Sequence, residues 1–158
     1  MYSCAMAQVK PEIETLAKIK VLGIGGGGGA AVDRMVQAKL RGVEFIAVNT
    51  DVQALQKSLA SIKLAIGKTV TRGLGAGMNP DMGRRSAEEN ANDVRSSIQG
   101  VDMVFLTGGL GGGTGSGALP EVAKICREAG ALTVAVVTKP FSFEGAQRKR
   151  IADDAYQE

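Results

Sequence analysis

The chain has 158 residues, 44% hydrophobic and 22% charged, with a formal net charge of +3. These values are typical of a soluble globular domain, and the charge is too small to indicate a nucleic-acid partner. The sequence contains no histidine, and neither Cys4 nor Cys126 has a metal-ligand partner at short spacing, which argues against the usual zinc sites and against a histidine base.

Residues 1–17 form a polar segment without a diagnostic motif, and we expect them to be an extension that precedes one domain over residues 18–158. This segment lacks the apolar core of a secretory signal. No later apolar run approaches the length of a membrane span, so we expect no direct membrane insertion. Two cysteines without an evident disulfide framework favour a cytoplasmic protein.

Short apolar runs rich in β-branched residues predict five strands. They cover residues 18–25, 43–50, 61–67, 101–109 and 131–140. Several are apolar almost throughout, which is typical of parallel strands covered on both faces. Because helical patterns lie between most of them, the sequence predicts a Rossmann-like, doubly wound α/β fold with a mostly parallel sheet and helices on both faces. Ligands of such sheets bind beyond the carboxyl ends of the strands.

Apolar residues at helical spacing predict the helices. They run from Val32 to Leu40, over a short stretch after Asp51, from Met82 to Ile98, from Ala118 to Ala129, and onward from about Glu144. Asn79 and Pro80 suit the start of the third helix. The sequence stops at "IADDAYQE", within the last helical pattern and without a capping glycine. We therefore expect the chain to be cut from a larger protein, inside or just after its last helix.

The first glycine run, "GIGGGGGAAVDRM", follows a predicted strand and opens a helix. Gly23, Gly25 and Gly28 match the GxGxxG pattern of a dinucleotide fold, and Asp51 follows 23 residues after Gly28, where an NAD ribose acid would lie. Bare backbone at a helix N-terminus binds phosphate well. The alternative is a tight turn without a ligand.

The second glycine run, "GGLGGGTGSGAL", also joins a strand to a helix. Its successive backbone N–H groups can surround an anion, and Thr114 and Ser116 add hydroxyl donors. It has no lysine and is therefore not a P-loop. A dehydrogenase needs one phosphate loop, so two on neighbouring strands indicate a triphosphate held from both sides.

Two further segments have both a functional and an ordinary interpretation. Gly75, Ala76 and Gly77 precede a helix and could close on a terminal phosphate, or form a plain turn. Glu144 could accept hydrogen bonds from a ribose with Arg148 on the same helix face, or the two could form an exposed ion pair. The basic run at 148–150 has no interleaved aromatics, which favours a solvated helix face over a nucleic-acid site.

Taken together, these motifs resemble the tubulin/FtsZ superfamily, and within it the bacterial cell-division branch. Residues 111–117 match the pattern [SAG]GGTG[SAT]G at every position, and "GVEFIAVNTD", "GLGAGMNP" and "LTVAVVTKPF" occur in the same order at similar spacing. The resemblance implies a cytoskeletal, filament-forming GTPase of septum formation that acts in the cytoplasm at the division site. It also implies GTP or GDP with Mg²⁺ as ligands and head-to-tail contacts with other subunits.

The resemblance also implies a set of nucleotide-binding residues. They are Gly26, Gly27, Gly28, Gly29, Ala30, Asn49, Asp51, Gly75, Ala76, Gly77, Gly112, Gly113, Thr114, Gly115, Ser116, Gly117, Glu144 and Arg148. The sequence departs from the family at Ala30, where an asparagine is usual, and this puts a side-chain contact to the nucleotide in doubt.

In the family, the residues that complete the guanine pocket and the catalytic acids lie in segments that follow the matched region, and the acids act on the GTP of the adjacent subunit. We therefore assign no catalytic residue within this chain, and expect it to bind GTP or GDP weakly and to hydrolyse little alone. Two alternatives stay open: an NAD-binding module of an oxidoreductase, which leaves "GGGTGSG" unexplained, and a filament-capping module with little nucleotide affinity.

Overall fold

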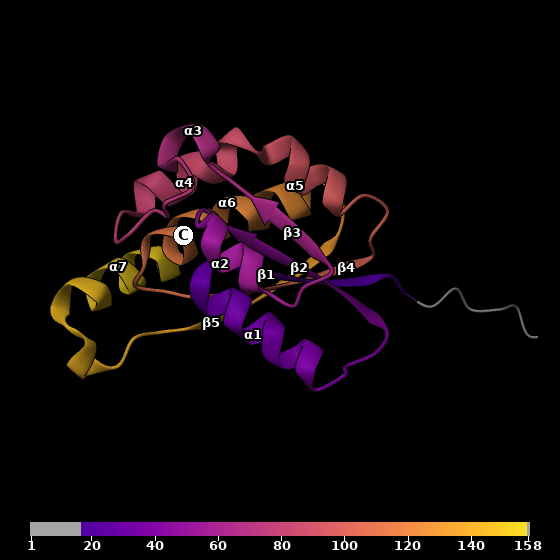
Figure 1. Cartoon of the computed structure of the whole chain (residues 1–158), viewed down its shortest axis with the longest axis horizontal. Helices are drawn as coiled ribbons and strands as arrows, with labels where there is room; N and C mark the ends of the chain where they lie inside the picture. Colours follow the sequence, from indigo (N-terminus) through magenta and orange to yellow (C-terminus); the bar gives the residue numbers. More distant parts are fainter. Residues whose placement is uncertain (1–16, 158) are drawn as a thin grey trace, which may run out of the picture.

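The computed structural model describes residues 17–157, so the predicted extension up to residue 16, with Cys4, lies outside the described residues. Five parallel strands form one sheet in the order β3-β2-β1-β4-β5 (Figure 1). Their bounds are β1 Ile19–Ile24, β2 Val43–Asn49, β3 Ile62–Ala65, β4 Met103–Gly109 and β5 Leu132–Thr138. All five predicted strands and the doubly wound topology are confirmed.

Helices cover the sheet on both faces. They are α1 Gly25–Gln37, α2 Val52–Lys57, α3 Lys68–Thr71, α4 Pro80–Glu89, α5 Ala91–Ser97, α6 Gly113–Glu128 and α7 Ala146–Gln157, with a 3₁₀ turn, η1, at Ser142–Glu144. Because successive strand residues point to opposite faces, Val21 packs under α1 and α2 whereas Leu22 packs in the larger core beneath α4, α5 and α6.

Two of the predicted helices differ from the structure in detail, and one short helix was not predicted. The predicted helix from Met82 to Ile98 is two helices, because Asn90 leaves the helical conformation between α4 and α5. Leu40 lies beyond α1, which ends at Gln37, and its side chain is 54% exposed. The four-residue helix α3 was missed, since one helical turn is too short to give a periodic signal.

One apolar surface has no helix over it among the described residues. A hollow of about 320 Å³ lies between α1 and strands β2, β4 and β5, and its lining is mostly apolar. Val136 and Leu132 on the edge strand β5 are 58% and 63% exposed. Within the described range, no helix has both the length and the hydropathy needed to cross a bilayer.

Candidate functional site

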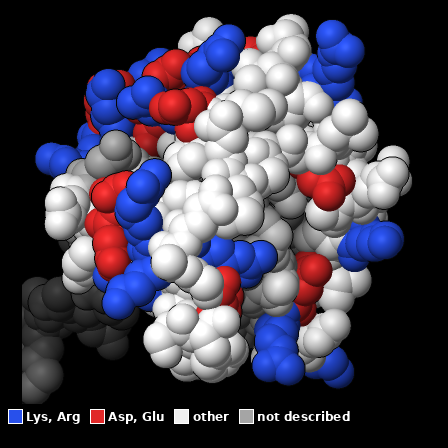
Figure 2. Space-filling model, turned by 90° about the vertical axis from the view of Figure 1, so that its left-hand side faces the viewer, with Lys and Arg blue, Asp and Glu red and all other residues white. Residues whose placement is uncertain are grey.

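Five sequence-predicted segments meet at the carboxyl edge of the sheet. They are the first glycine run after β1, Asn49 to Asp51 after β2, residues 72–79 after α3, the second glycine run after β4, and residues 139–148 after β5. Since all five strands are parallel, their carboxyl ends share one edge. Figure 2 views this side of the molecule, where residues other than Lys, Arg, Asp and Glu fill most of the centre and charged residues lie mainly around it.

The two glycine runs lie directly against each other. A methyl group added to Gly25 would lie 3.1 Å from the amide nitrogen of Gly115, and one added to Gly27 would lie 3.2 Å from the amide nitrogen of Gly109. The start of α1 therefore contacts the backbone at the start of α6 and at the end of β4, and the Cβ of Thr114 lies 3.3 Å from the same Gly25 position. The prediction that both runs lie on neighbouring strands is confirmed, because β1 pairs with β4.

The N-termini of α1 and α6 have no side-chain cap. Ile24 and Gly112 occupy the two capping positions, and neither provides a capping hydrogen bond. By contrast, Asp51 caps α2 and Asn79 caps α4 through their side chains. The first N–H groups of a helix have no partner inside it. That of Gly113 donates to the carbonyl of Gly77, and the following N–H groups of α6 and those at the start of α1 can bind an anion. Both helices begin inside the glycine runs, which leaves loops shorter than the sequence had suggested.

The glycines of these runs divide into two groups by their surroundings. A methyl group on Gly117 would overlap the carbonyl oxygen of Pro80, and one on Gly28 would overlap that of Thr107. These glycines permit close packing of α6 on α4 and of α1 on β4. The space around Gly26, Gly29 and Gly112 is open to 4 Å. Bare backbone at the open positions is not required by packing, so these are the glycines that a ligand can use.

The two hydroxyls of the second run make internal hydrogen bonds. Thr114 Oγ1 lies 2.7 Å from Thr50 Oγ1, and Ser116 Oγ accepts a hydrogen bond of 2.8 Å from the N–H of Gly111. Both residues are buried. These hydrogen bonds join the end of β2 to α6 and close the loop, and the expectation that both hydroxyls also bind a ligand stays a prediction. Thr50 was missed by the motif search, although it stands between the predicted residues Asn49 and Asp51.

Asn49 and Asp51 are oriented by backbone donors. Asn49 Oδ1 accepts hydrogen bonds from the N–H of Thr50 at 2.8 Å and of Asp51 at 3.3 Å. Asp51 Oδ1 accepts from the N–H of Gln53 at 2.8 Å and of Ala54 at 3.2 Å. Among the described residues, Asp51 Oδ2 has no hydrogen-bond partner, so one carboxylate oxygen of this fixed side chain is available.

Residues 72–79 form the third glycine loop, which packs against the segments that follow β2 and β4. The N–H of Gly75 donates to the carbonyl of Thr50 at 3.3 Å, and the N–H of Gly113 donates to the carbonyl of Gly77 at 2.8 Å. A methyl group on Gly75 would lie 3.6 Å from Asp51 Cβ. These residues therefore close the carboxyl edge between β2 and α6, and their contact with a terminal phosphate stays a prediction.

Glu144 and Arg148 form the ordinary ion pair that the sequence left open. Arg148 Nη1 donates to Glu144 Oε2 at 3.1 Å, and the N–H of Phe141 donates to Glu144 Oε1 at 3.1 Å. A methyl group on Gly111 would lie 3.1 Å from the carbonyl oxygen of Arg148, so the pair stands beside the second glycine run. The aromatic rings of Phe141 and Phe143 stack next to it, with centroids 5.3 Å apart.

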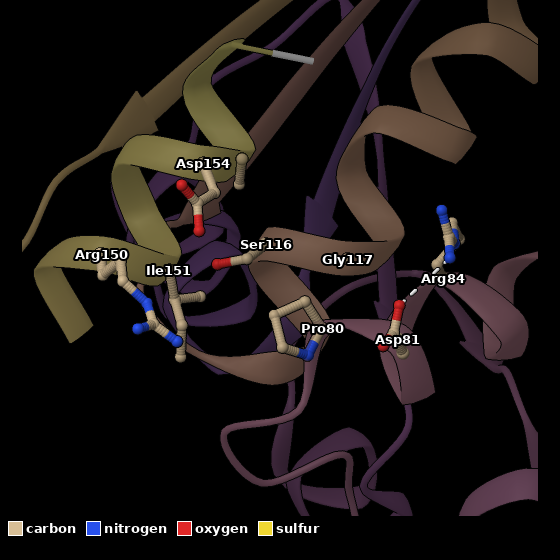
Figure 3. Close-up of a pocket in the computed structure, with 9 residues that line it drawn as sticks. Pro80, Asp81, Arg84, Ser116, Gly117, Arg150, Ile151 and Asp154 are labelled. Atoms are coloured by element: carbon tan, nitrogen blue, oxygen red, sulfur yellow. Dashed lines mark hydrogen bonds and ion pairs between the residues drawn. The ribbon is translucent and has the colours of Figure 1, made fainter. Parts of the chain in front are cut away.

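Two hollows adjoin the edge. One, of about 240 Å³, lies between the start of α1 and α2, and Gly26, Gly29, Ala30 and Asn49 help to line it. The other, of about 270 Å³, lies between α4, α6 and α7 (Figure 3). Its lining includes charged side chains of both signs, and an ion pair joins Arg84 to Asp81 there. Only the first hollow reaches the open glycines.

A family model described as "Tubulin/FtsZ family, GTPase domain" matches residues 18–158. The chain belongs to this family. A solved structure titled an empty FtsZ dimer from M. jannaschii is 48% identical, with a TM-score of 0.89, and the match covers 92% of this chain and 42% of that one. An FtsZ W319Y mutant from the same organism gives the same identity and TM-score over 90% and 43% of the two chains.

A further solved structure similar to this chain is titled CetZ2 from Haloferax volcanii, a GTPγS-bound protofilament. It is 26% identical, with a TM-score of 0.80, over 89% of this chain and 45% of that one. The chain therefore spans less than half the length of each of these solved structures. The resemblance found from sequence motifs is confirmed at the level of family and fold.

The tubulin/FtsZ family implies a magnesium ion, and the described residues at this edge offer it few protein ligands. Within the described residues, no cluster of three or more histidine, cysteine or acidic side chains could form a closed metal site. Mg²⁺ usually keeps several waters and takes one or two carboxylates together with phosphate oxygens. Asp51, with one available oxygen, fits that role.

Proposed function

We propose that this chain binds GTP and GDP across the carboxyl edge of its sheet, as the nucleotide-binding part of a filament-forming GTPase. The observation that supports this most directly is the pair of uncapped helix N-termini, α1 and α6, lying in contact with open glycines on each side. Two anion-binding helix starts on adjacent strands suit a chain of phosphates better than a single one.

Each segment has a role in this proposal. The N–H groups of α1 and α6 bind the phosphates, and Glu144 holds the ribose after its pairing with Arg148 loosens. Residues 75–77 contact the terminal phosphate. Asp51 would hold a Mg²⁺ ion together with the phosphates, and the ion would supply charge neutralisation there. The base lies near Ala30, at the hollow beside α1.

We also propose that the chain acts in a head-to-tail filament. The similar proteins are described as an FtsZ dimer and a CetZ2 protofilament, which supports subunit contacts of this kind. Hydrolysis would then need acidic residues from an adjacent subunit, and the cell would use the filament in the cytoplasm for division. In this proposal the chain alone binds nucleotide and turns over little of it.

The proposal is tested by calorimetric titration of the purified chain with GTP and Mg²⁺, and in parallel with NADH. Gly112→Ala provides the matched variant, because Gly112 has extended backbone geometry that alanine adopts and open space for the methyl group. We expect GTP binding in the wild type, weaker binding in Gly112→Ala, and equal melting temperatures. Binding of NADH alone, or of neither ligand, would overturn the proposal.

A further inference from the structure

Side chains at the end of α4 hydrogen-bond to the backbone just before and within α3, and so join the two ends of the segment that contains the third glycine loop. The N–H of Gly67, just before α3, donates to Asn90 Oδ1 at 2.8 Å. The N–H and Oγ1 of Thr69 donate to the two carboxylate oxygens of Glu89 at 3.1 and 2.5 Å. Residues 67–90 therefore run from the end of β3 along the carboxyl edge of the sheet. The side chains at the end of this segment then cap α3 at its beginning.

The helix that receives this cap cannot be stable by itself. α3 has four residues, far fewer than the dozen or so that an isolated helix needs. Its own capping position is Gly67, which has no side chain to accept a hydrogen bond. The Glu89 carboxylate, which lies outside α3, accepts the hydrogen bonds that a capping side chain would accept. The hydrogen bonds from Thr69 hold the pKa of Glu89 below its ordinary value, so the carboxylate is ionised at neutral pH.

The other end of α3 leads directly into the glycine loop. Thr71 Oγ1 donates to the carbonyl of Gly67 at 2.9 Å, within α3, and lies 3.3 Å from the carbonyl of Thr50. The N–H of Leu74 donates to the carbonyl of Thr71 at 3.0 Å. Any movement of α3 would therefore pass to Gly75 and Gly77, which contact the ends of β2 and α6.

We propose that Glu89 and Asn90 are positioning residues for the third glycine loop, fixing α3 so that Gly75 to Gly77 reach the terminal phosphate of a bound nucleotide. This inference rests on the proposed function for its ligand. A loop that meets only the terminal phosphate contributes to the binding of GTP and not to that of GDP. Loss of the cap therefore lowers the preference for GTP over GDP.

A purely structural cap would behave differently. It would lower thermal stability and would weaken both nucleotides alike, or neither. The ratio of the two affinities separates these cases. Glu88 supplies a matched control, because it is an exposed neighbouring glutamate on the same helix, and its side chain makes no hydrogen bond or ion pair among the described residues.

The experiment compares the wild-type chain with Glu89→Gln, Glu88→Gln and Thr69→Val. Calorimetry with GTP and with GDP, each with Mg²⁺, gives the affinity ratio. We expect Glu89→Gln to reduce the GTP-to-GDP preference by about 3- to 10-fold, within the range for the net contribution of one ordinary hydrogen bond, because Glu89 is exposed to solvent. Thr69→Val should act in the same direction and add little to Glu89→Gln in the double variant. Glu88→Gln should match the wild type, and an unchanged ratio in Glu89→Gln would overturn the proposal.

A second measurement does not depend on nucleotide. Amide hydrogen exchange, followed by mass spectrometry, reports opening of residues 68–79 in the free chain. Glu89→Gln should exchange faster there, with no change in α1, whereas Glu88→Gln should leave both regions unchanged. If the wild type binds no nucleotide, the proposed function fails while this result still decides whether Glu89 holds the loop. Unchanged exchange at 68–79 would exclude the positioning role.

Discussion

The hydroxyl oxygen of Thr50 lies 2.7 Å from that of Thr114, although the two residues are 64 positions apart. Thr50 follows β2 directly and Thr114 stands in the first turn of α6. Both side chains are buried, with relative exposures of 1% and 9%. This contact joins the two segments that flank the third glycine loop, so it fixes the width of the edge on which the phosphates are proposed to lie.

Replacing one member of this pair should lower the free energy of unfolding more than replacing both. Thr114→Val keeps the shape of the side chain but leaves the buried hydroxyl of Thr50 without its partner, which costs about 1–3 kcal/mol. In Thr50→Val/Thr114→Val both polar groups are gone, and we expect much of that loss to be recovered. Urea unfolding of the nucleotide-free chain measures both values. A double variant as unstable as the sum of the singles would contradict this account.

The open and packed glycines should respond to alanine in opposite ways. Gly29→Ala adds a methyl group in open space inside α1, so we expect it to stabilise the free chain by about 1 kcal/mol. The same methyl group should weaken GTP binding. Gly117→Ala forces α6 away from the carbonyl of Pro80, and we expect a destabilisation of about 1–3 kcal/mol or more. Melting curves and titration calorimetry check both, and a destabilised Gly29→Ala would contradict the distinction.

The sequence predicted the strands and the edge because both depend on local patterns. The strands are apolar runs, and each site segment follows the end of a strand or precedes a helix. Which glycines are packed and which are open could not be predicted. The overlap between a methyl group on Gly117 and the carbonyl of Pro80 depends on how α4 crosses α6. The cap on α3 was missed for the same reason: Glu89 and Thr69 are 20 residues apart and form no motif. Tertiary contacts decide such roles, and one sequence does not contain them as a pattern.

The Cys126 thiol should be inert in the folded chain. It is buried in α6, and burial raises its pKa to about 11 from an ordinary 9.0. A rise of two units lowers the thiolate fraction about 100-fold at a given pH. We expect alkylation of Cys126 at pH 8.5 to be slow in the native chain and rapid in denaturant, as followed by peptide mass spectrometry. Because the raised pKa belongs to the folded state, its stabilising contribution is lost as pH rises from 9 towards 11.

We expect the free energy of unfolding to fall in acid, partly because Glu89 becomes protonated. Its pKa is lowered in the folded state by the hydrogen bonds from Thr69, so the unfolded state binds the proton more readily. The stabilising contribution is therefore present above the ordinary value of 4.5 and is lost as pH falls below it. Urea midpoints between pH 3.5 and pH 6 should fall less steeply in Glu89→Gln than in Glu88→Gln. Asp153, whose pKa is lowered by Lys139, acts in the same direction and keeps some dependence in both variants.

Restoring the residue usual in the family should strengthen nucleotide binding. Ala30 is exposed in α1 and helps to line the 240 Å³ hollow beside the open glycines. Ala30→Asn offers an amide that can hydrogen-bond the base, and one such bond contributes about 1 kcal/mol, or roughly fivefold in affinity. Asparagine is a weaker helix former than alanine, so the free energy of unfolding of the free chain should fall by a few tenths of a kcal/mol.

Ala31→Asn is the matched control, because Ala31 does not line the hollow. Calorimetry with GTP should show the gain in Ala30→Asn alone, and equal affinity in both variants would place the base away from α1.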